Sequence, residues 1–178
     1  MSSKFKAVFA SLIAALTGCV IGGRTIYHVD NPFQFLSHAA SHGEIAVMVV
    51  GEPYPDKRDQ VAQVIAAAFD RTFSSLNNPF RAAEASAANV SKIVVLFDTA
   101  NNISAQTVYA DPSKIASAKP GTGSRTSVRA LYCGDGPYSE YTMSFFAPNS
   151  PEDEKFASLM RDLALNTIPR ERNPDRDR

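Results

Sequence analysis

Two short apolar runs stand out from the polar segments around them. Residues 44–50 and 92–97 are rich in β-branched side chains, and continuous runs of this length are typical of strands buried on both faces. Between them, apolar residues recur at helical spacing from Val61 to Phe73, with charged residues on the opposite side. The pattern predicts a strand, a helix and a parallel strand joined by a right-handed crossover.

The second half of the chain predicts a hairpin and a final helix. Apolar and polar residues alternate along both halves of residues 126–146, and Gly134-Asp135-Gly136-Pro137 supplies the turn. One face of this hairpin is expected to be buried, while the other faces water or a partner. Ser150 and Pro151 then mark the start of a helix with an apolar stripe.

This order of elements predicts an α+β two-layer sandwich, in which a mixed sheet of four to five strands carries two helices on one face. Residues 101–110 suit either a strand or a short helix, and both alternatives stay open. The order resembles that of the amino-terminal domain of TolB-like periplasmic proteins. The uncovered face of the sheet is the expected docking surface.

The start of the chain has a different character. Lys4 and Lys6 precede an apolar run over residues 7–16, which is too short to cross a bilayer and is typical of a secretory signal. An Ala-rich helix packed in a globular core is the alternative. The run closes with Leu16-Thr17-Gly18-Cys19, and this ending resembles the lipobox of bacterial lipoproteins.

The resemblance implies a lipid anchor on Cys19. The chain would be cut before this cysteine, its sulfur joined to diacylglycerol and its new amine acylated, for example with palmitate. Thiolate chemistry explains why a cysteine is required there. Val20 stands where an aspartate would direct inner-membrane retention in enteric bacteria, so a periplasm-facing position on the outer membrane is expected. The chain is similar in this respect to small proteobacterial lipoproteins.

Four regions follow from these patterns. They are a signal peptide (1–18), a lipidated N-terminus and linker (19–43), a single α+β domain (44–169) and a disordered, charged tail (170–178).

The charge balance argues against a nucleic-acid partner. The chain has 18 basic and 18 acidic residues, and removal of Lys4 and Lys6 with the signal leaves 16 against 18. Nucleic-acid binding needs clustered Lys and Arg. The expected partners are therefore the membrane, through the anchor, and another protein of the cell envelope.

The three histidines lie close together in the sequence, as His28, His38 and His42. His38 and His42 are four residues apart, so on a helix both rings share one face, as metal ligands require. Surface histidines without a ligand, or a response to periplasmic pH, are the alternatives. No cofactor is expected.

Cys133 is the second cysteine and a candidate reactive thiol. A buried small hydrophobic side chain is the alternative. Because a nucleophile needs a base within hydrogen-bond reach and no motif encodes one, no catalytic residue is assigned.

These observations favour a non-enzymatic, lipid-anchored interaction or structural module of the cell envelope. A periplasmic lipoprotein that binds a small ligand or a metal through His38 and His42 is the alternative. A hydrolase based on a thiol or a carboxylate is the third hypothesis.

Overall fold

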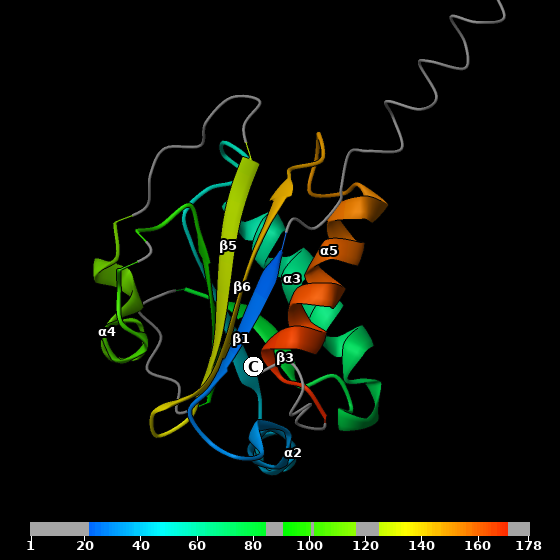
Figure 1. The fold of residues 1–178 in the computed structure, drawn as a ribbon. Helices are drawn as coiled ribbons and strands as arrows, with labels where there is room; N and C mark the ends of the chain where they lie inside the picture. The colour runs from blue at the N-terminus through cyan, green and yellow to red at the C-terminus, as the bar shows by residue number, and fades with distance from the viewer. Residues whose placement is uncertain (1–21, 85–90, 101, 117–124, 171–178) are drawn as a thin grey trace, which may run out of the picture.

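The computed structural model describes residues 22–84, 91–100, 102–116 and 125–170 (Figure 1). Cys19, the expected signal peptide and most of the expected tail lie outside these residues. The elements are, in chain order, β1 (Gly23–Tyr27), α2 (Pro32–His42), β2 (Ile45–Val50), α3 (Arg58–Thr72), η1 (Ser74–Leu76), β3 (Phe80–Ala83), β4 (Lys92–Phe97), α4 (Ala105–Ala110), η2 (Pro112–Lys114), β5 (Arg125–Cys133), β6 (Pro137–Phe146) and α5 (Glu154–Thr167).

The strands form one mixed sheet in the order β1-β6-β5-β4-β2-β3. β2 runs parallel to both β3 and β4, whereas the pairs β4–β5, β5–β6 and β1–β6 are antiparallel. The predicted parallel pairing of residues 44–50 with 92–97 is therefore confirmed, as is the hairpin over 126–146.

β2 and β4 are buried along their whole length because apolar side chains cover both of their faces. Alternate residues of a strand point to opposite faces. Val47 and Val95 accordingly lie in a large core with α2, α3 and α5, while Met48 and Val94 lie in a smaller core with α4.

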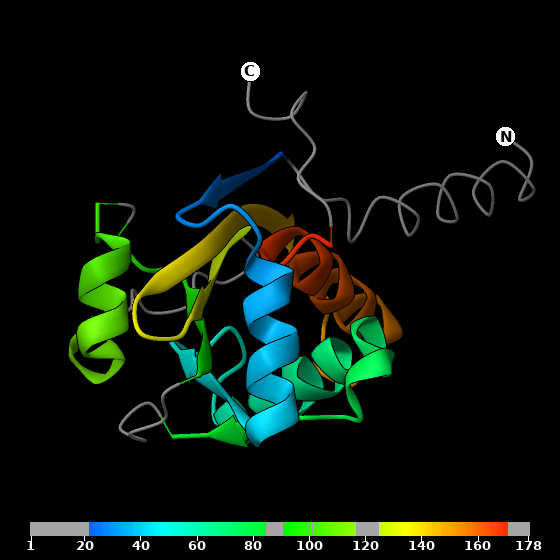
Figure 2. The same ribbon diagram turned by 90° about the horizontal axis from the view of Figure 1, so that it is seen from below.

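The helices are divided unequally between the two faces. Figures 1 and 2 show α3 and α5 packed side by side on one face, with α2 beside them at the lower end of the sheet. The other face carries α4, which is short and lies over β2, β4, the end of β5 and the start of β6. Lys92 fixes α4 to the sheet, because its Nζ donates a hydrogen bond to the Tyr109 carbonyl oxygen at 2.9 Å. The outward faces of β1 and of most of β5 and β6 are left open.

The α+β class with a mixed sheet is confirmed, but the expected numbers of elements are too low. The described residues contain six strands, where four to five were expected, and four α-helices, where two were expected. The additional strands β1 and β3 are short edge strands with little buried surface, so their sequences carry no clear apolar pattern. The ambiguous segment 101–110 contains the helix α4, which occupies the face that was expected to be bare.

The expected domain boundary at residue 44 lies too late. β1 pairs with β6 over its whole length, and α2 buries Leu36 in the large core. Residues 23–43 therefore belong to the folded domain, and of the expected linker only residues 19–22 precede it. Within the described ranges, no helix is both long enough and apolar enough to cross a membrane.

Candidate functional site

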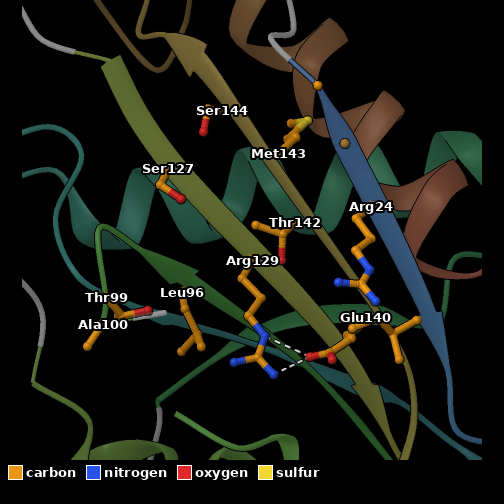
Figure 3. A pocket seen from close by; sticks show the side chains of 13 residues that line it. Arg24, Leu96, Thr99, Ala100, Ser127, Arg129, Glu140, Thr142, Met143 and Ser144 are labelled. Atoms are coloured by element: carbon orange, nitrogen blue, oxygen red, sulfur yellow. Dashed lines mark hydrogen bonds and ion pairs between the residues drawn. The ribbon is translucent and has the colours of Figure 1, made fainter. Parts of the chain in front are cut away.

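The open part of the sheet forms a groove of about 490 Å³ (Figure 3). Its walls come from β1, β6, β5 and the segment that follows β4, a region that α4 does not cover. The side chains that face it are mostly polar: Arg24, Thr99, Ser127, Arg129, Glu140, Thr142 and Ser144, together with the apolar Ile26 and Leu96.

The sheet register explains why these polar side chains gather. Ser127 faces Ser144 across the β5–β6 pair, and Thr142 faces Arg129 on one side and Arg24 on the other. Because side chains alternate along each strand, Ser127 and Arg129 of β5 and Glu140, Thr142 and Ser144 of β6 line the groove. The residues between them enter the large core, whereas Leu131 and Cys133, farther along β5 on the groove side, are buried in the smaller core. The prediction that one face of the hairpin is buried and the other open is confirmed.

A buried ion pair lines part of the groove. Arg129 and Glu140 are diagonal neighbours on β5 and β6, and Arg129 Nε donates a hydrogen bond to Glu140 Oε2 at 2.7 Å. Arg129 Nη2 donates to the same oxygen (Figure 3). The side chains of Arg129 and Glu140 are only 15% and 7% exposed. A desolvated ion pair of this kind keeps one geometry, because separating the two side chains would leave an unpaired buried charge and destabilise the fold.

The ion pair also connects the groove to its surroundings. Arg129 Nη1 donates to the Ile103 carbonyl oxygen at 2.5 Å, which ties β5 to the segment before α4. On the other side, His28 Nε2 lies 3.7 Å from Glu140 Oε1. Glu140 is therefore held between a strand residue and the connection from β1 to α2.

Asp98 shapes the wall of the groove beside β4. Its backbone has a positive φ of 47°, a conformation that aspartate tolerates better than most residues. The Asp98 carboxylate accepts a hydrogen bond from the Ser127 amide at 2.8 Å, and the Asp98 amide donates to the Ser127 carbonyl at 2.9 Å. These two bonds turn the chain so that Thr99 and Ala100 line the groove.

Sequence reasoning identified the open hairpin face but not the charged residues on it. Arg24, Arg129 and Glu140 carry no motif, and the alternation of polar residues in β5 and β6 was their only signal. The pairing of Arg129 with Glu140 depends on the hairpin register, which is set by the turn and by an irregularity at Tyr132 and Cys133.

The structure separates the three histidines that the sequence groups together. His28 contacts Glu140 beside the groove, whereas the rings of His38 and His42 lie 4.2 Å apart on α2. The expectation that His38 and His42 share one face of a helix is confirmed. Among residues placed by the structure, no group of three or more His, Cys, Asp or Glu side chains is arranged to hold a metal ion.

Cys133 lies in the smaller core and is 0% exposed. Burial raises the pKa of its thiol to about 12, because the low-dielectric surroundings disfavour the thiolate. The nucleophilic form is therefore scarce at neutral pH, and we assign no chemistry to this residue.

We expect Cys133 to resist alkylation in the folded protein. Iodoacetamide at pH 8 should leave it unmodified under native conditions, since both burial and the raised pKa keep it protonated, and should modify it fully in denaturant. Mass spectrometry of the peptide that contains Cys133 measures this. Rapid modification without denaturant would contradict the buried placement.

Comparison with known proteins adds one distant similarity. No protein-family model and no curated protein matches the chain. Among solved structures, the chain is similar to a variant of PelC from Paraburkholderia phytofirmans, described as a dodecamer, with 9% sequence identity, a TM-score of 0.45, and coverage of 85% of this chain and 98% of that chain. A similarity of this size supports no inference about function.

Proposed function

We propose that this protein is a lipid-anchored, non-enzymatic module of the cell envelope, facing the periplasm from the outer membrane, that binds a partner protein in the groove. The observation that carries the proposal is the polar groove on the part of the sheet that no helix covers. The lipobox-like ending at Cys19 supports the location.

The anchor and the groove are close in the chain. Gly23, the first residue of β1, lies four residues after Cys19, a contour length of at most about 14 Å for an extended chain. β1 forms one wall of the groove. A lipid on Cys19 therefore holds the groove near the membrane surface, where it can meet other envelope proteins.

The groove favours an extended, acidic segment of the partner. Of the described side chains that line it, two are arginines and one is a carboxylate, and that carboxylate is bonded to Arg129. Arg24 is exposed at the rim and Ile26 is 36% exposed beside it. A carboxylate of the partner would complement Arg24, and Ile26 would contribute apolar contact.

The sheet edge supplies a second means of recognition. β1 is the outermost strand of the described sheet, so no described strand pairs with its far side. A segment added there would form main-chain hydrogen bonds and place alternate side chains over the groove. This mode needs no catalytic group. The one carboxylate among the described groove side chains, that of Glu140, is already paired with Arg129, which agrees with a binding role.

Reversing one charge at the rim tests the proposal. We expect Arg24→Glu to reduce recovery of the partner from solubilised envelope membranes at least tenfold (about 1.4 kcal/mol), because an attraction becomes a repulsion. Quantitative mass spectrometry of the co-purified proteins measures the change. Arg161→Glu is the matched control, since Arg161 is also exposed but lies on α5, on the far face of the sheet. Equal recovery by the two variants, or no reproducible partner of the unmodified protein, would contradict the proposal.

A further inference from the structure

A second pocket, of about 420 Å³, lies at the C-terminal end of α2, outside the groove. It is bounded by α2 and by the turn between β5 and β6. The side chains that matter here are His38, His42, Glu44, Tyr132, Asp135 and Tyr138.

The helix brings the two imidazoles together. His38 and His42 are one helical turn apart on α2, and their ring centroids are separated by 4.2 Å. Residues four apart on a helix lie on the same face, so both rings border the same space. His38 and His42 are both exposed, and water or an ion can therefore reach them.

A hydrogen bond fixes the tautomer of His42. Its Nδ1 lies 2.8 Å from the His38 carbonyl oxygen. Because a carbonyl oxygen only accepts, this bond requires the hydrogen on Nδ1, and in the neutral ring the lone pair is then on Nε2. Ser41 Oγ donates to the same carbonyl at 2.7 Å and lies 3.0 Å from His42 Nδ1, which helps to hold the ring. This arrangement is the usual one for a histidine that ligates a metal through the other nitrogen.

We propose that this pocket binds a late first-row divalent metal ion through Nε2 of His42 and a ring nitrogen of His38. Neutral imidazole suits Cu²⁺, Ni²⁺ and Zn²⁺, and Cu²⁺ forms the most stable complexes of the three. The inference does not depend on the docking function, because it concerns different residues on a different part of the surface.

The remaining coordination positions are open. Glu44 Oε1 forms an ion pair with Arg81 Nε at 3.1 Å, and Asp135 Oδ1 accepts a hydrogen bond from the Tyr138 hydroxyl at 2.6 Å, so each neighbouring carboxylate already engages one partner. In the described part of the chain, no third His, Cys, Asp or Glu completes a metal-binding group. The protein thus provides two ligands, and water or a group from another molecule provides the others.

Copper titration of the full chain in detergent, prepared without a polyhistidine tag, tests the site. The protein has no tryptophan, so its intrinsic fluorescence comes from tyrosine, and Tyr132 and Tyr138 line the pocket. We expect Cu²⁺ to quench this fluorescence at one equivalent. Electron paramagnetic resonance should show splitting from bound nitrogen.

Histidine substitutions separate this site from non-specific binding. His38→Ala and His42→Ala should each weaken Cu²⁺ binding by at least about tenfold, since removing only a neighbour of a ligand already costs about 10- to 100-fold. His28→Ala, the matched control outside the pocket, should leave the affinity unchanged. Circular dichroism checks that the variants fold. The proposal is overturned if the His38→Ala/His42→Ala double variant binds as tightly as the unmodified protein, or if His28→Ala loses as much affinity as either pocket variant.

Discussion

Cys19→Ala should abolish incorporation of an alkyne-labelled fatty acid and move the protein from the membrane fraction to the soluble fraction. Each buried CH₂ of an acyl chain contributes about 0.8 kcal/mol of membrane affinity, and two or more chains give stable anchoring. Because the variant loses every acyl chain at once, we expect the whole population to move from the membrane fraction to the soluble fraction. Labelling of cells, followed by fractionation and immunoblotting, measures both effects.

The second cysteine provides the control for this experiment. Cys133→Ala should leave labelling and fractionation unchanged, because Cys133 is buried in the smaller core and is unsuited to acylation. The lipoprotein assignment is wrong if the unmodified protein takes up no label, or if Cys19→Ala keeps it.

Arg129→Ala should lower the free energy of unfolding by about 3–5 kcal/mol, the usual cost of breaking a buried ion pair by removing one partner. The reason is the charge that is left behind. The Glu140 side chain is 7% exposed, and two of its hydrogen bonds come from Arg129. Urea denaturation followed by circular dichroism measures the loss.

Two further variants show whether burial is the cause. Arg81→Ala removes an arginine whose side chain is 52% exposed and lies 3.1 Å from Glu44 and 3.8 Å from Asp70, and exposed ion pairs of this kind contribute less than about 1 kcal/mol each. The double variant Arg129→Met/Glu140→Leu removes both buried charges and should recover most of the stability lost in Arg129→Ala. If Arg129→Ala lowers the free energy of unfolding by no more than Arg81→Ala does, the Arg129–Glu140 ion pair is not desolvated as described above.

The fold could be predicted from the sequence wherever a segment buries a regular stripe of apolar residues. β2, β4, the hairpin, α3 and α5 all do so, and each was expected close to its place. α2 was missed as part of the domain because only Pro32 and Leu36 are buried in it, too few for a visible helical period. The short edge strand β1 was missed because it is held by backbone pairing to β6, which leaves no mark on the sequence.

The site was predictable only in outline. The alternation in β5 and β6 indicated an open face, but Arg129 and Glu140 meet across strands, so their contact depends on a register that composition does not determine. His38 and His42 needed only the helix to be brought together, and the sequence therefore anticipated their shared face. Cys19 lies outside the described residues, and the lipid anchor stays a prediction.

Site-specific photo-crosslinking in intact cells tests the central claim, that a partner occupies the groove, most directly. A photoreactive amino acid at Thr142, which points into the groove in Figure 3, should give a discrete adduct with one envelope protein. The same amino acid at Arg161 on α5 should give none. Absence of an adduct from position 142, or the same adduct from both positions, would contradict the assignment of the groove as the docking surface.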